Sequence, residues 1–251
     1  MNKLTHNYIC FSINGYKEDL LKWLNITISF FEQNGLFLKR VLYDRVINNN
    51  SKIFSQSLLK FHEHIKGMNI TVLHPFIINY IENAKIASTE HYGCFYDQEE
   101  ETLLIYFDES YNKNDSITKF IIKYISMILQ NNHAISGYFY TQQNEYTYFM
   151  GGANCSQNLF KENGLKWWNT YNNKSFIIGK FRHIYKINLL SIEHLSIKIG
   201  NDSFREWVKK NNYGKFKKIA SQNWLWIINE TKQQEIAQTL FNLNLLIGAG
   251  I

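Results

Sequence analysis

Acidic side chains gather in one short stretch of this 251-residue chain, Asp97–Glu101, and Asp108 and Glu109 follow closely. Paired carboxylates can hold a divalent metal ion for hydrolysis. However, no histidine or lysine accompanies them in an order typical of nucleases. A polar run between two β-like segments is more simply explained as the solvated tip of a hairpin. A metal-dependent hydrolase is therefore only a third alternative.

Other catalytic combinations are weaker. His62 and His64 stand two residues apart, so on a helix they would point in different directions, whereas helical metal ligands usually lie four residues apart. Cys155 could form a thiol dyad with His133 or His183 only if folding united them, and a structural cysteine is the better interpretation. The sequence contains no GxSxG, GxxxxGK[ST] or strand-to-helix GxGxxG motif. We expect no enzymatic activity, no cofactor and no bound metal.

Composition indicates a globular protein, because hydrophobic residues make up 45% and charged residues 19%. The three cysteines, Cys10, Cys94 and Cys155, are far apart and suggest neither a disulfide framework nor a zinc site. No apolar run approaches the roughly 18 residues that span a bilayer, and the N-terminus lacks the pattern of a signal peptide. We therefore expect a cytoplasmic protein without membrane contact.

The net charge of +6 would permit binding to a polyanion. The densest basic segment runs from Lys209 to Lys218, with Tyr213 and Phe216 among its lysines. Basic residues interleaved with aromatic ones can hold single-stranded nucleic acid, which makes a nucleic-acid-binding module the alternative function. A solvated helix end and turn is the simpler explanation, so a nucleic-acid partner is not expected.

The elements of the first half alternate between strand and helix patterns. Asn34-Gly35 stops the first helix, because glycine tolerates a left-handed backbone. The predicted elements are a strand over Asn7–Ile13, a helix over Lys17–Gln33, a strand over Leu36–Tyr43, a helix around Phe54–Ile65, and a short strand over Asn69–Leu73 that ends before His74-Pro75.

The middle and the end of the chain continue this alternation. Ser203 and Glu206 fit a capping box at a helix start, and Thr231 could cap the closing helix. The other predicted elements are a hairpin of His91–Tyr96 and Thr102–Phe107, a helix from Asp115-Ser116 to Gln130, a β segment over Ala134–Tyr140, and a strand over Trp224–Ile228.

These patterns predict a mixed α/β (α+β) fold, with antiparallel-rich sheets packed against helices. No Pro/Gly/Ser-rich linker interrupts the chain, since Gly151-Gly152 is too short to be one. We therefore expect one continuous domain over residues 1–251, or two intimately packed halves over 1–150 and 151–251.

Two separated blocks carry a resemblance to a known family. Residues 181–247 run from an arginine-containing strand-like segment to a helix opened at Leu190-Ser191, a Gly200-Asn201 stop, a Phe-Arg-Glu-Trp helix start, an apolar strand and a closing helix. The phrase SGYFY at Ser136–Tyr140 follows a helix in mid-chain. This order resembles the bacterial immunity proteins encoded beside type VI secretion effectors, over these two blocks of the chain.

The resemblance implies an α/β protein without catalytic motifs, which binds a cognate toxin and blocks its active site or an essential motion. Some members are paired with nuclease toxins, which must be basic to hold their substrate, so an acidic tip could mimic phosphate charge. Aromatic side chains often dominate interfaces. Self-association as a homodimer stays open. The expected toxin-binding residues are Asp97, Glu99, Glu100 and Glu101 of the acidic tip, and Trp167, Trp168 and Tyr171 of a polar, aromatic segment.

Overall fold

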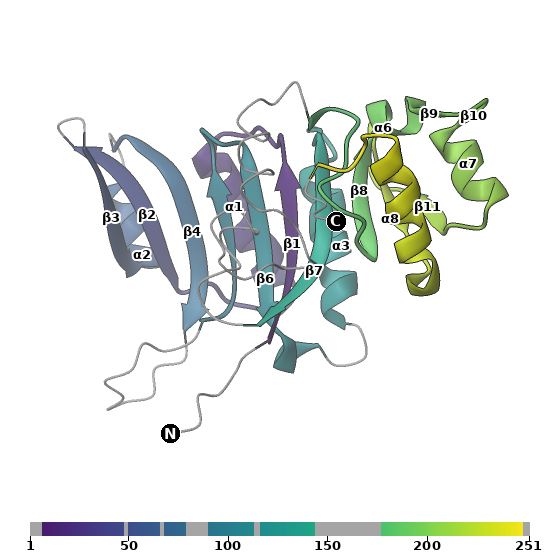
Figure 1. Cartoon of the computed structure of the whole chain (residues 1–251). Coiled ribbons are helices and arrows are strands. Elements are labelled where there is room, and N and C mark those ends of the chain that lie inside the picture. Colours follow the sequence, from purple (N-terminus) through teal and green to yellow (C-terminus); the bar gives the residue numbers. More distant parts are fainter. Residues whose placement is uncertain are drawn as a thin grey trace.

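One open antiparallel sheet of ten strands runs through the computed structural model, which describes residues 7–47, 50–65, 68–78, 90–112, 116–143 and 177–247 (Figure 1). The strand order is β11-β12-β8-β7-β1-β6-β5-β4-β2-β3. The strands are β1 (Asn7–Asn14), β2 (Arg40–Ile47), β3 (Asn50–Ser57), β4 (Ile70–Ile78), β5 (Glu90–Asp97), β6 (Thr102–Asp108), β7 (Ser136–Gln143), β8 (Ile187–Ser191), β11 (Lys215–Lys218) and β12 (Asn223–Ile227). A separate two-stranded ribbon consists of β9 (Lys198–Ile199) and β10 (Asp202–Ser203). The predicted mixed α+β class is confirmed.

Helices cover the two faces of the sheet in different places. The first face packs against α1 (Leu20–Gln33), α2 (Leu58–His64) and α3 (Ser116–Ile128). The second face is covered at its β8-β12-β11 end by α6 (Ile192–Ser196), α7 (Phe204–Lys210) and α8 (Gln233–Asn242) (Figure 1). Two single 3-10 turns, η1 (Glu109–Tyr111) and η4 (Glu230–Lys232), complete the described elements. In the part of the chain that the structure describes, we find no helix with both the length and the apolar character needed to cross a bilayer.

The middle of the second face is rich in tyrosine. Strand side chains alternate between the two faces, so β1 sends Phe11 to the helices of the first face and Cys10 to the second. The second-face cluster is buried and consists of Tyr8, Cys10, Leu104, Tyr106, Tyr138, Tyr140 and Tyr185. Arg182 is buried beside it, donates a hydrogen bond to the Tyr138 hydroxyl and stacks 4.9 Å from the centre of that ring.

Helix α1 starts later than the sequence predicted. Asp19 has an extended backbone, and its carboxylate accepts hydrogen bonds from the N–H groups of Leu21 and Lys22 at 3.0 and 2.9 Å. It is therefore the N-cap, so the prediction of a helix from Lys17 was wrong by three residues. The other end follows the prediction, because Gly35 adopts a left-handed backbone (φ 74°) after the last turn.

The prediction was also wrong at the β2-β3 hairpin. The expected helix over Phe54–Ile65 is strand up to Ser57, and α2 begins only at Leu58. Phe54 instead stacks on its cross-strand partner Tyr43, with ring centres 5.4 Å apart. The second strand occupies Arg40–Ile47 rather than Leu36–Tyr43.

Strand β4 continues through His74-Pro75, where the sequence predicted its end. Residues opposite each other in an antiparallel pair alternate between hydrogen-bonded and non-bonded positions. The Gln98 N–H donates to the Thr71 carbonyl at 3.0 Å, so Thr71 is at a bonded position. Every second residue of β4 after Thr71 also faces β5, and the Pro75 nitrogen therefore points toward β5. The ladder between β4 and β5 is interrupted there and resumes at Phe76. Proline therefore costs one ladder bond without ending the strand.

The C-terminal third follows most of its predicted pattern. The Ser203–Glu206 capping box is confirmed, with the Ser203 N–H donating to the Glu206 carboxylate at 2.8 Å. The arginine-containing segment is not itself a strand, since β8 begins only at Ile187. Thr231 is not the cap of the closing helix, because its N–H donates to the Asn229 side chain at 3.2 Å.

Gly137 of the SGYFY phrase is required by packing. A Cβ atom there would lie 2.6 Å from the Ser12 carbonyl oxygen and 3.0 Å from Cε1 of Phe11. We expect Gly137→Ala to lower the free energy of unfolding by about 1–3 kcal/mol through overpacking, measured by urea unfolding. Ser136→Ala is the control, since among the described residues the Ser136 side chain contributes a single 3.3 Å hydrogen bond, from Asn14. Equal stability of the two variants would contradict this account of the glycine.

Candidate functional site

The acidic hairpin tip lies beside the start of α1. The register of β1 on β6 pairs Asn14 with Thr102, so the loop after β1 runs next to the turn between β5 and β6. The Tyr16 N–H donates to the Glu101 carbonyl at 3.1 Å and fastens the two together. We call the combined surface the acidic rim; its carboxylates are Glu18, Asp19, Asp97, Glu99, Glu100 and Glu101.

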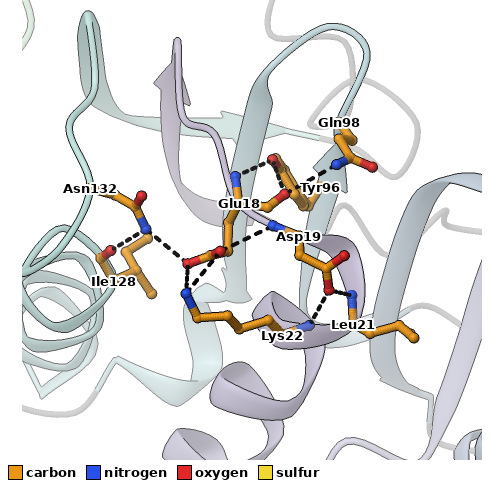
Figure 2. A network of polar contacts seen from close by, with 8 residues as sticks. All are labelled: Glu18, Asp19, Leu21, Lys22, Tyr96, Gln98, Ile128 and Asn132. Atoms are coloured by element: carbon orange, nitrogen blue, oxygen red, sulfur yellow. Dashed lines mark hydrogen bonds and ion pairs between the residues drawn. The ribbon is translucent and has the colours of Figure 1, made fainter.

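Glu18 is the centre of the rim (Figure 2). Its carboxylate forms an ion pair with the Lys22 ammonium at 2.9 Å and accepts a hydrogen bond from the Asn132 side chain at 3.0 Å. It also accepts from the Asp19 N–H at 3.1 Å. Asn132 in turn donates to the Ile128 carbonyl at 3.4 Å, so the network joins the loop after β1 to the end of α3 (Figure 2).

Tyr96 holds the backbone of Glu18 from the β5 side. Its hydroxyl accepts from the Glu18 N–H at 2.9 Å and lies 3.0 Å from the Glu18 carbonyl, to which it donates (Figure 2). Burial, reinforced by the neighbouring carboxylates, raises the pKa of Tyr96 to about 12. The phenol therefore stays protonated and remains a hydrogen-bond donor at neutral pH. Its ring is fully buried and packs against Tyr16 and Trp23.

The tip itself is a tight turn. The Asp97 carboxylate accepts from the Glu100 N–H at 2.9 Å, and Glu101 adopts a left-handed backbone with φ 53°. The Glu101 side chain is only 15% exposed and forms an ion pair with Lys17 at 2.9 Å. Asp97 and Glu101 therefore shape the turn, while Glu99 is exposed at its apex.

Two carboxylates of the rim, Asp97 and Glu18, have opposite pKa shifts. Burial raises the pKa of Asp97 above its usual range, and the neighbouring glutamates add to this effect. Burial would also raise the pKa of Glu18, but hydrogen bonds from Lys22, Asn132 and the Asp19 backbone outweigh it and lower the pKa. Glu18 is therefore ionised at neutral pH. As the pH falls, Asp97 becomes protonated before Glu18.

The rim is negative on a positive protein. Six carboxylates stand against two lysines, Lys17 and Lys22, whereas the whole chain carries +6. A shallow, open hollow of about 370 Å³ lies among Lys17, Glu18, Tyr96, Gln98 and Glu101. Chemically, this arrangement presents fixed negative charge to a basic partner.

The carboxylates do not converge as a hydrolytic metal site requires. Asp108 is the last residue of β6 and Glu109 follows it, roughly 20 Å from the tip at about 3.4 Å per residue. Asp108 caps η1 by accepting from the Ser110 N–H at 2.8 Å. Among the described residues, no three His, Cys, Asp or Glu side chains are grouped to hold a metal ion. The two acidic groups therefore do not form the carboxylate pair that the hydrolase alternative would need.

The basic segment is divided between two elements. Lys209 and Lys210 end α7, where positive charge favours the helix dipole. Lys215, Lys217 and Lys218 lie on β11, the last strand of the sheet, where alternation turns Lys217 and Lys218 to opposite faces. Phe216 and Tyr213 pack into the second-face core. No single face collects the lysines and aromatic side chains that the nucleic-acid interpretation requires.

Trp167, Trp168, Tyr171 and Cys155 lie outside the described residues. Cys10 and Cys94 are buried, and burial raises the pKa of each thiol, so both stay protonated. His64 lies on α2 with Nδ1 2.7 Å from the Lys60 carbonyl. The central role of Glu18 was missed by sequence reasoning, although its spacing of four residues from Lys22 was a signal.

We expect Glu18→Gln to lower the free energy of unfolding by about 1–3 kcal/mol at pH 7, because it removes an ion pair and charged hydrogen bonds from a side chain only 11% exposed. The folded pKa of Glu18 lies below its unfolded value of about 4.3, so this contribution is complete above pH 4.3 and is lost as pH falls through the folded value. Urea unfolding of both proteins from pH 7 to pH 3 should show a converging difference. A difference that stays constant over this range would contradict the shift.

A solved structure has a fold similar to that of this chain. No protein-family model matches the sequence. No curated protein matches it either. Among solved structures, one described as a type VI secretion (T6SS) protein of Pseudomonas aeruginosa superposes with a TM-score of 0.54. The match covers 97% of this chain and 77% of that one at 7% sequence identity, so it shows that the two chains share a fold.

Proposed function

We propose that this chain is an immunity protein of a type VI secretion effector pair, which binds a cognate toxin and neutralises it by covering its active site. It acts without catalysis, as a monomeric inhibitor or a homodimer. The observation that carries the proposal is the acidic rim, a concentrated negative surface on a protein of net charge +6. Such a surface complements a toxin that is basic because it binds a nucleic acid.

Hydrogen bonds fix the side chains of the rim. The Glu18 carboxylate, the Tyr96 hydroxyl and the Asp97 carboxylate are each held by hydrogen bonds of 3.0 Å or less. A surface that is ordered before binding loses less entropy when a partner arrives. The fixed rim therefore supplies the affinity, and Glu99, at its exposed apex, contacts the toxin directly.

The fold supports a link to type VI secretion. The solved structure with the same fold is described as a T6SS protein. The resemblance of residues 136–140 and 181–247 to type VI immunity proteins points the same way and rests on the sequence. The rim adds a support of a different kind, because it concerns the charge of the surface and not the order of the elements.

Capture of the toxin tests the proposal. The tagged full-length chain should retain the toxin encoded by the adjacent gene in a one-to-one complex, and its co-expression should rescue growth of cells that produce the toxin. Absence of both capture and rescue would refute the immunity function.

Charge reversal tests the surface. We expect Glu99→Lys to slow association with the toxin by about tenfold at low salt, because charges at the rim of an interface act mainly on the association rate. Glu32→Lys is the matched control; it makes the same charge change near the other end of α1, roughly 20 Å from its start. Stopped-flow association rates at two salt concentrations separate the variants. Equal slowing by both would mean that net charge, and not the rim, governs encounter.

The nucleic-acid alternative has a different signature. A chain that used Lys209–Lys218 would bind a single-stranded oligonucleotide with an affinity that falls steeply as salt rises, because phosphate neutralisation releases counterions. Such binding, together with failure to capture the toxin, would favour that alternative.

A further inference from the structure

The two edges of the sheet are constructed differently. Strand β11 is four residues long and carries three lysines, which is a common way to block pairing with other chains. Strand β3 is eight residues long, carries one lysine and no proline, and pairs with β2 in a continuous register over all eight residues. In the described part of the chain β3 pairs only with β2. The described residues therefore leave this edge without the usual protection.

Hydrogen bonding shows which β3 residues face outward. The Leu58 N–H donates to the carbonyl of Lys39 at 2.9 Å, and these two residues extend the β2-β3 register. Since bonded and non-bonded pairs alternate, the backbone groups of Phe54 and Gln56 face β2. Those of Ser51, Ile53 and Ser55 point away from the sheet and form a regular row of donors and acceptors.

The side chains at this edge favour a binding strand. Ile53 is 70% exposed and Leu59, at the start of the adjoining α2, is 74% exposed. The β2-β3-α2 unit, residues 39–64, contains five lysines and arginines and two carboxylates. An added strand with apolar and acidic side chains would fit this surface, whereas a second copy would bring two positive units together.

The edge is continuous with the acidic rim. Cross-strand pairing places Asp97, Val72, Asp44 and Ile53 in one row across β5, β4, β2 and β3. At about 4.8 Å between strands, Ile53 lies roughly 14 Å from Asp97. None of the described helices covers the second face at β2 and β3 (Figure 1). One partner can therefore contact both the rim and the edge.

We infer that the toxin adds an extended, acidic segment to the β3 edge as an eleventh strand, while a basic patch of the same toxin binds the acidic rim. This inference rests on the proposed function. Strand addition supplies affinity through backbone hydrogen bonds that do not depend on side-chain identity. It also enlarges the contact toward the roughly 800 Å² per partner of a typical stable complex.

Proline substitution tests the added strand. Ile53→Pro removes an outward N–H without removing a bond to β2, so the protein should fold normally while its affinity for the toxin falls at least tenfold. Lys218→Pro is the matched control on the opposite edge, because the bond from the Ile219 N–H to the Asn223 carbonyl turns the Lys218 N–H outward. Toxin affinity is measured by calorimetry, and folding by circular dichroism and thermal unfolding.

Hydrogen exchange of the unmodified complex gives a second measurement that does not depend on any variant. The amides of Ile53 and Ser55 should exchange rapidly in the free protein and become protected when the toxin binds. Unchanged exchange, or equal affinity of Ile53→Pro and the unmodified protein, would overturn the added strand and leave the immunity function standing. A dimer that Ile53→Pro converts to a monomer with unchanged toxin affinity would overturn it as well, in favour of a second copy. Failure of the unmodified protein to bind the toxin or rescue growth would instead refute the proposed function.

Discussion

Pairing of β1 with both β6 and β7 is the contact on which the rest of the structure depends. β1 lies between strands that follow it by about 100 and 130 residues, and nearly all of its side chains are buried. The register on β6 ends at Asn14 and Thr102, which brings the loop after β1 against the tip of the β5-β6 hairpin. The acidic rim is a consequence of this register, because a shift by one residue would turn every β1 side chain to the opposite face.

An open sheet also leaves two edges whose backbone groups need a partner or protection. β11 is short and lysine-rich, and its charge protects this edge against pairing with other chains. β3 is long and regular and presents an exposed isoleucine. The lysines that first suggested nucleic-acid binding are thus explained by their position on a protected edge and a helix end. Strand β3, whose second half was predicted to be helical, is the better candidate for binding.

Sequence patterns predicted the elements that depend on neighbouring residues. The β5-β6 hairpin, α3 and the Ser203–Glu206 capping box are local, and alternation, helical spacing and capping chemistry were enough to find them. The prediction failed at β3, where Phe54 belongs to a strand and stacks on Tyr43 of the neighbouring strand. It also missed the Glu18 network, whose partners Tyr96 and Asn132 lie 78 and 114 residues away. Contacts at such separations depend on strand register, which local patterns do not contain.

Net charge is a poor guide to what such a protein binds. A uniformly distributed charge of +6 would repel a basic partner. The fold instead brings six carboxylates from two distant segments together at the β5-β6 turn. Salt screens charges over about 8 Å at physiological ionic strength, so an approaching partner responds to the nearby rim more than to distant lysines. The Lys22–Glu18 and Lys17–Glu101 pairs offset part of the repulsion between the rim carboxylates and leave Glu99 exposed. The rim can therefore be both stable and negative, which a sequence with the same composition but a different register would not achieve.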